Sequence, residues 1–200
     1  MLFSSEGLYR TAYLHGLPLY SKLTNAEQVQ VYSYIKFFHD LCLDQMGEAL
    51  TLQDSRNFLW RAFIKLGLSP EPHFFENFRD DHIVEMHSRS GAVLFRNLKF
   101  FEYCSYSFEE LYTQAPTTLF EFSRDTEVFL APLKEKIFQG TQEFREVRLS
   151  YDWKEKSSMD SLEVQCEVEF MHPLYSKGDK REPAAVILLK RQSLFGDRGM

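Results

Sequence analysis

The spacing of hydrophobic residues changes near residue 80, and this change divides the chain into two parts. Before residue 80, apolar side chains recur every three or four positions, which is typical of helices with one buried face. After it, apolar and polar residues alternate, which is typical of strands with one buried side. We therefore predict a helical N-terminal extension over residues 1–80, a second domain over 81–193 and a short tail over 194–200.

Two amphipathic helices are expected in the first part, over residues 25–46 and 57–66. Thr24 or Asn25 provides a side-chain oxygen that can cap the start of the first helix. The second helix should end at Gly67, because glycine readily adopts the left-handed conformation that closes many helices. The sequence between this helix and residue 81 is expected to be an irregular connector.

The residue pattern of the second part predicts two strands, a helical segment and three further strands. The helical segment runs from about Leu98 to Gln139. The expected strands cover residues 82–88, 92–97, 142–153, 161–172 and 183–192. Strands at both ends of a helical segment indicate an α+β fold with an antiparallel sheet.

The residues at the joints of this pattern resemble those of the PAS domain family. Asn97 can end the second strand and cap the next helix, and Ser107 with Glu110 has the spacing of a capping box. The matching positions are Gly91, Val93, Asn97, Ser107 to Leu111, Gly140 and the pair Pro173-Leu174. The resemblance implies a five-stranded antiparallel sheet of order 2-1-5-4-3, with helices on one face and the N-terminal helices as a cap on the other. It also implies a sensory or protein-interaction role.

Three of the expected strands, 82–88, 92–97 and 183–192, carry apolar residues on both faces. A sheet that is apolar on both sides must be covered on both sides. The helices at 25–46 and 57–66 are the available cover, either for their own sheet or for that of a partner. We expect a homodimer formed through these helices and the sheet face, together with a protein partner in signalling.

Charge and composition exclude several classes of function. The net charge is −6 and Lys or Arg residues never run beyond two in a row, so a nucleic-acid partner is not expected. No apolar stretch approaches the ~18 residues of a membrane-spanning helix, so no membrane partner is expected either. The three cysteines are scattered and no signal peptide is recognisable at the N-terminus. These features predict a cytoplasmic protein.

The sequence offers little for catalysis, metal binding or a covalent cofactor. Cys104 lacks the motif of flavin-binding relatives, and residues 123–140 contain no histidine for a haem iron. The six histidines have no metal-ligand spacing and are expected at the surface or in turns. No nucleophile elbow, phosphate loop or metalloprotease motif occurs. We predict no catalytic residue, no metal and no cofactor, with haem and covalent flavin disfavoured.

Aromatic and aliphatic residues of the second part are expected to converge between the sheet and the helices, where a PAS domain binds its ligand. The candidate cavity residues are Phe95, Phe101, Leu111, Leu119, Phe120, Phe129, Leu133, Ile137, Leu149 and Val164. Such rings either surround an apolar or planar ligand or fill the space completely.

The function these features favour is a non-catalytic sensory or protein-interaction module in signal transduction or its regulation. The alternatives are a small-molecule enzyme that uses an α+β cone cavity and a ligand-free dimeric scaffold. An ionisable group in the cavity would favour the enzyme, and a largely apolar cavity with one or two polar anchors would favour the sensor.

Overall fold

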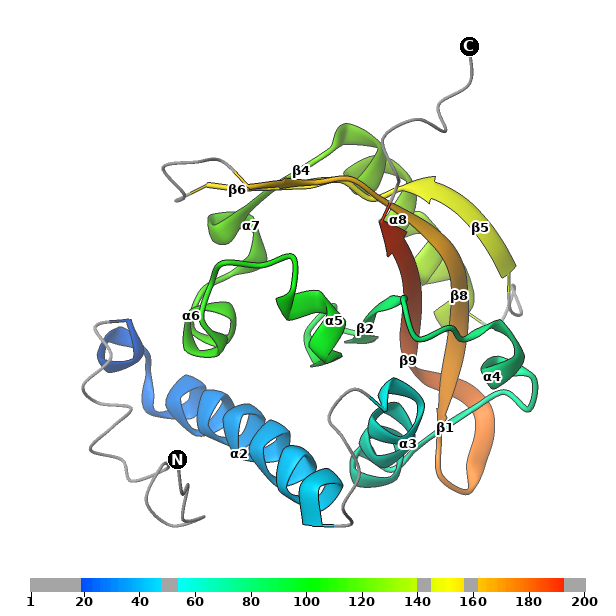
Figure 1. Cartoon of the computed structure of the whole chain (residues 1–200), viewed down its shortest axis with the longest axis horizontal. Helices are drawn as coiled ribbons and strands as arrows, with labels where there is room; N and C mark the ends of the chain where they lie inside the picture. The colour runs from blue at the N-terminus through cyan, green and yellow to red at the C-terminus, as the bar shows by residue number, and fades with distance from the viewer. Residues whose placement is uncertain (1–18, 48–53, 140–144, 157–161, 193–200) are drawn as a thin grey trace.

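The computed structural model describes residues 19–47, 54–139, 145–156 and 162–192 (Figure 1). The fold is α+β, and the five expected strands form one curled antiparallel sheet. They are β2 (Ile83–Ser88), β3 (Val93–Arg96), β5 (Arg145–Ser150), β8 (Cys166–Ser176) and β9 (Asp179–Gln192). Their order in space is β3-β2-β9-β8-β5, which confirms the predicted order 2-1-5-4-3.

Strands outside the predicted five extend this core. The segment expected to be an irregular connector contains β1 (Leu68–Pro70), which pairs with the far end of β8, and the short helix α4 (Phe74–Asn77). A small second sheet consists of β4 (Phe120–Phe122), β6 (Trp153–Glu155) and β7 (Glu163–Val164). The expected third strand, 142–153, is therefore divided. It pairs with β8 up to Ser150, and from Trp153 onward it belongs to the second sheet.

The helices begin and end at the residues that local chemistry favours. The N-terminal helices are α2 (Asn25–Gly47), which follows the 3-10 turn η1 (Tyr20–Lys22), and α3 (Ser55–Leu66). Gly67 ends α3 with φ 63°, in the predicted left-handed conformation. Between the strands lie α5 (Leu98–Phe101), α6 (Phe108–Thr113), α7 (Pro116–Leu119) and α8 (Arg124–Phe138). Asn97 caps α5 and Ser107 with Glu110 forms the predicted capping box of α6, whereas Gly140 lies outside the described residues.

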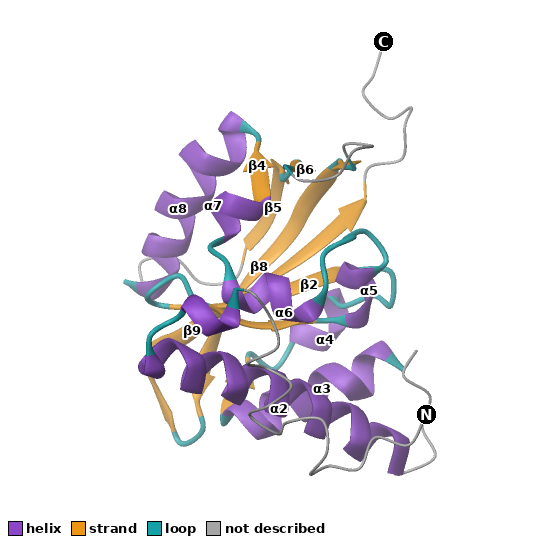
Figure 2. Ribbon diagram, turned by 90° about the vertical axis from the view of Figure 1, so that its left-hand side faces the viewer, coloured by secondary structure: helices purple, strands orange, loops and turns teal. Residues whose placement is uncertain are grey.

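The sheet separates two hydrophobic cores. On one face, alternate residues of β2 and β9 such as Ile83 and Leu188 pack with residues of α5 to α8 and of the second sheet. On the other face, Val84 and Leu189 pack against Phe63 of α3 and the rest of a second cluster. Figures 1 and 2 show α2 and α3 together at one end of the molecule, away from α7 and α8. The N-terminal helices of the same chain cover this face, as predicted for a sheet that is apolar on both sides.

This covering bears on the expected homodimer. The apolar sheet face is buried beneath α3 and α4 of the same chain, which is one of the two arrangements expected from the sequence. The residues of the first half of α2 do not belong to this core; Val31 and Ile35 pack with Tyr20 and with Tyr112 of α6. A homodimer stays a prediction.

Candidate functional site

A β-bulge in β3 determines which side chains face the helical side of the sheet. Met86 pairs with Phe95 and His87 pairs with Val93, so Leu94 is an extra residue without a partner in the ladder. Because an extra residue interrupts the alternation of side chains, Val93 and Arg96 lie on the same face as Glu85, and Phe95 lies on the other. The bulge therefore brings a guanidinium group opposite a carboxylate.

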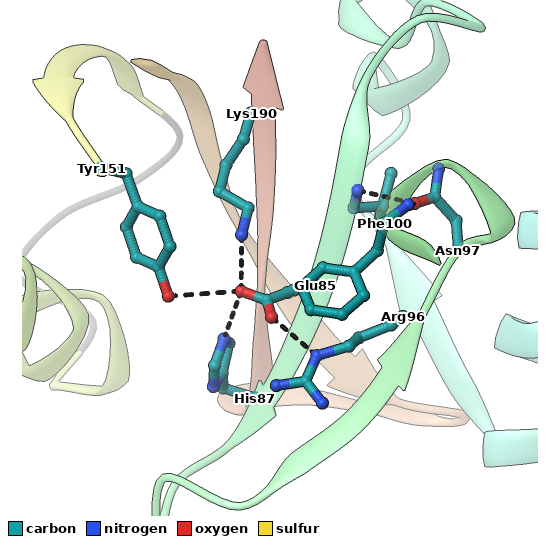
Figure 3. Close-up of polar contacts among 8 residues, drawn as sticks. Glu85, His87, Arg96, Asn97, Phe100, Tyr151 and Lys190 are labelled. Carbon is teal, nitrogen blue, oxygen red and sulfur yellow. Dashed lines mark hydrogen bonds and ion pairs between the residues drawn. The ribbon is translucent and has the colours of Figure 1, made fainter. Parts of the chain in front are cut away.

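Glu85 is the centre of a buried ionic cluster (Figure 3). Its Oε1 accepts a hydrogen bond of 2.8 Å from Arg96 Nε, and its Oε2 accepts one of 2.7 Å from Lys190 Nζ. The Tyr151 hydroxyl donates to the same Oε2 at 3.4 Å, and His87 Nε2 lies 3.7 Å from it, too far for a hydrogen bond. All five residues are buried, with Lys190 0% and Glu85 3% exposed. The carboxylate therefore has partners on both oxygens.

Aromatic rings complete the surroundings of the two cations. Arg96 lies over the Phe100 ring at 4.5 Å, and Lys190 Nζ lies 4.1 Å from the Tyr151 ring centre and 4.9 Å from that of Trp153. Such contacts stabilise desolvated cations by up to about 2 kcal/mol each. Burial raises the pKa of Glu85, but the charges of Lys190 and Arg96 outweigh burial and hold it well below the usual value. Glu85 is therefore ionised, and Arg96 and Lys190 are its counter-ions.

A cavity of about 430 Å³ opens beside this cluster, between the β2–β3 hairpin and α8. Polar residues on its walls include Glu85, His87, Arg96 and Lys134. Its aromatic walls are Phe100, Phe120, Phe122, Phe138, Tyr151 and Trp153. The volume falls in the range of small-molecule sites, and the combination of aromatic walls with a few polar groups is typical of them.

Two further groups on the cavity wall, Lys134 and His87, have lowered pKa values. Burial lowers the pKa of Lys134 to about 8, with Glu85 raising it and the like charge of Lys190 lowering it further. Burial also lowers the pKa of His87 to about 4, helped by the charges of Lys134 and Lys190 against the opposing effect of Glu85. At neutral pH the cavity therefore holds a neutral imidazole and a largely protonated amine.

The residues predicted to line a cavity are mostly core residues instead. Phe120 lines the cavity beside Glu85. The rest of the group on this side of the sheet belongs to the first core or packs against it: Phe101, Leu111, Leu119, Leu133, Ile137, Leu149 and Val164. The side chain of Phe129 lies outside the described residues. Phe95 was wrongly placed, because the bulge at Leu94 turns it into the second core, where it lies 5.9 Å from Phe58.

The expectation that the histidines lie at the surface or in turns is wrong for three of them. His82, His87 and His172 are buried in strands or at their ends. His82 Nε2 lies 2.9 Å from Glu169, and burial lowers the pKa of His172 to about 4. Within the described residues, no three His, Cys, Asp or Glu side chains gather as a metal site would require.

Comparison with known proteins assigns no family. No family model matches the chain, and neither does any curated protein. A crystal structure of the PAS domain of a Desulfitobacterium hafniense protein resembles this one, with 14% sequence identity over 60% of this chain and 99% of that domain. The TM-score of that pair is 0.34. A likeness of this size carries no argument about function, so the site must be judged on its own chemistry.

Two further features of the described residues are the state of the thiols and the hydropathy of the helices. Cys42, Cys104 and Cys166 are free, and burial raises the pKa of Cys104 to about 12, which makes it a poor nucleophile. No described helix combines the length and the hydropathy needed to cross a bilayer.

Proposed function

We propose that the chain is a PAS-like sensory or protein-interaction module in signal transduction or its regulation, and that it works by binding a small molecule. The strand order and the capped joints at Asn97 and Ser107 support the PAS-like part of the proposal. The observation that carries the binding role is the 430 Å³ cavity beside Glu85, with a polar wall built from strands and an aromatic enclosure. Sites of this kind on rigid elements hold ligands in fixed orientations.

The ionic cluster favours binding over chemistry. A general base needs a pKa near the working pH, whereas Lys190 and Arg96 hold the pKa of Glu85 well below its usual value. His87, with a pKa of about 4, is likewise a weak base. We propose that neither residue is catalytic and that no haem or covalent flavin takes part. The three free thiols are compatible with a cytoplasmic location, which we retain in the proposal together with homodimerisation.

Native mass spectrometry of the purified full-length chain tests this proposal. We expect a mass above that of the polypeptide under native conditions, lost under denaturing conditions, together with the mass of a dimer. A ligand-free protein that also binds nothing from a mixed set of acidic, basic and neutral fragments would contradict the sensor and favour a scaffold.

An enzyme is the second candidate, because ionisable groups do reach the cavity. Lys134 is the specific observation, since an amine with a pKa of about 8 is partly unprotonated near neutral pH and can attack a carbonyl group. Propanal would condense with this amine and lose water, and cyanoborohydride would reduce the imine to a stable secondary amine. Preferential propylation of Lys134 over exposed Lys136, located by peptide mass spectrometry, would favour the enzyme. Equal modification of both lysines would count against it.

A further inference from the structure

The buried groups beside the cavity carry an excess of positive charge. Glu85 is one carboxylate, and it is shared by two cations, Arg96 and Lys190. Its oxygens can offset one of these charges, so about one positive charge remains buried within the cluster. Burying an unbalanced charge is costly, and an anion that enters the site would remove that cost.

Lys134 increases this excess from the opposite side of the cavity. It lies on α8, which faces the β2–β3 hairpin across the cavity, and its pKa of about 8 leaves it largely protonated at pH 7. At the cavity mouth, Arg89 and Glu135 carry opposite charges, and Arg89 is in addition 3.4 Å from Glu182. Among these exposed side chains one positive charge faces two negative ones, so the positive excess is confined to the interior.

Arg96 offers the hydrogen-bond donors that an anion needs. Its Nε donates to Glu85, whereas Figure 3 shows the two terminal nitrogens on the side of the guanidinium away from that carboxylate. Neither terminal nitrogen donates a hydrogen bond to any residue within the described ranges. Arg96 is only 4% exposed and lines the cavity, so these donors belong to a largely buried side chain that faces a bindable space. A planar guanidinium with free terminal donors is well suited to a carboxylate.

The remaining walls are suited to the other end of such a ligand. Phe120, Phe122 and Phe138 line the cavity together with the aromatic residues of the cluster. Rings of this kind enclose a flat apolar group and exclude water, which strengthens the ionic contacts beside it. An inorganic anion would leave these walls unused.

We propose that the cavity binds a small organic acid, whose carboxylate lies between Arg96 and Lys134 and whose planar apolar body lies against the phenylalanine rings. This inference rests on the proposed ligand-binding function and names the chemical class of the ligand. It adds a charged end group to the apolar or planar ligand expected from the sequence.

A matched pair of probes tests the charge requirement. 3-Phenylpropanoate and 3-phenylpropanamide have the same shape and differ in charge, and the affinity of each for the full-length protein can be measured by NMR titration at pH 7. We expect the acid to bind at least tenfold more tightly than the amide. Acetate and phosphate, which lack the ring, should bind more weakly than the phenyl acid.

Two lysine variants on the same helix localise the effect. Lys134→Met should weaken binding of the acid about tenfold and leave the amide unchanged, whereas Lys136→Met, an exposed position on α8, should change neither. If the amide binds as tightly as the acid, or K134M has no effect on the acid, the proposed ligand class is wrong while a ligand-binding function stands. If acidic, basic and neutral fragments all leave the cavity resonances unmoved, both proposals fail.

Discussion

The free energy of folding should depend strongly on the Glu85 carboxylate. Two cations are taken out of water beside it, and its oxygens provide their ion pairs. Removal of one partner from a buried pair costs about 3–5 kcal/mol, because the remaining charge is left uncompensated in a medium of low polarity. The aromatic faces around Arg96 and Lys190 reduce this cost but do not neutralise the charges.

Glu85→Gln should therefore lower the free energy of unfolding at pH 7 by about 3–5 kcal/mol. The change keeps the shape of the side chain and removes the negative charge. Urea unfolding monitored by fluorescence measures the effect, and Glu121→Gln is the control, because Glu121 is exposed on β4. A loss below about 1 kcal/mol, within the range of surface substitutions, would contradict the role given to Glu85.

His87 predicts a definite pH dependence of stability. Its pKa falls from the usual 6.5 to about 4 on folding, so the unfolded chain binds a proton that the folded chain does not. Stability is therefore complete above about pH 6.5 and is lost as the pH falls towards 4. Between pH 6 and pH 5, one such histidine lowers the free energy of unfolding by about 1 kcal/mol.

The variant His87→Gln should lose about 1 kcal/mol less than the wild type over this pH interval, as measured by urea unfolding at both pH values. His172, with a similarly lowered pKa, keeps its own contribution in both proteins. The control is His73→Gln. Glu76 raises the pKa of exposed His73, so its contribution has the opposite sign and its removal should not reduce the acid loss. Equal slopes for wild type and H87Q would show that His87 titrates normally in the folded chain.

At the scale of elements, most of the sheet could be predicted because alternation and local capping are encoded within short segments. Gly67, Asn97 and Ser107 act through residues next to them in sequence, and the structure places each as expected. The bulge at Leu94 could not be predicted from alternation, since it depends on how β3 pairs with β2. That one residue moved Phe95 out of the expected cavity and Arg96 into it.

The charged residues of the ionic cluster could have been recognised in the sequence, although alternation alone did not reveal them. Glu85 interrupts an apolar run in its strand, and Arg96 and Lys190 each end one. A charged residue at such a position must find a partner on a neighbouring strand, because unpaired charges are rarely buried. The order 2-1-5 places these three strands side by side, so the partners could have been named before their distances were known.

Two neighbouring residues of α3, one buried and one exposed, allow the contribution of packing to be measured apart from that of helix propensity. Phe63 is 1% exposed and lies in the second core, 5.5 Å from the ring of Phe74, whereas Ile64 is 60% exposed. Phe63→Ala should lower the free energy of unfolding by about 3–5 kcal/mol, through lost burial and the cavity that remains. Ile64→Ala should change it by no more than about 0.5 kcal/mol. Equal effects in urea unfolding would mean that α3 does not cover the sheet.

The whole molecule is joined by a core that crosses the predicted boundary at residue 80. Leu41 of α2, Phe58 of α3 and Phe74 of α4 share one cluster with Met86 and Ile187 of the sheet. β1 also joins the sheet from the N-terminal side, through its pairing with β8. The second half of α2, together with α3 and α4, is therefore part of the second core, and these helices cover the sheet whatever their role in assembly.

A fragment of residues 80–200 should accordingly fail to behave as a soluble monomer. Without α3 and α4, the face of the sheet that carries Val84, Phe95 and Leu189 would be open to water. An apolar patch larger than a few hundred Å² drives association, so the fragment should elute as a dimer or aggregate in size-exclusion chromatography with light scattering. The full-length chain measured at the same concentration is the reference, and F63A within it should shift towards the behaviour of the fragment. A monomeric fragment with a native circular dichroism spectrum would mean that the cover is dispensable and that residues 81–193 fold alone. Self-association of the fragment beyond that of the full chain would instead show that the N-terminal helices complete the fold by hiding a surface that a second molecule would otherwise occupy.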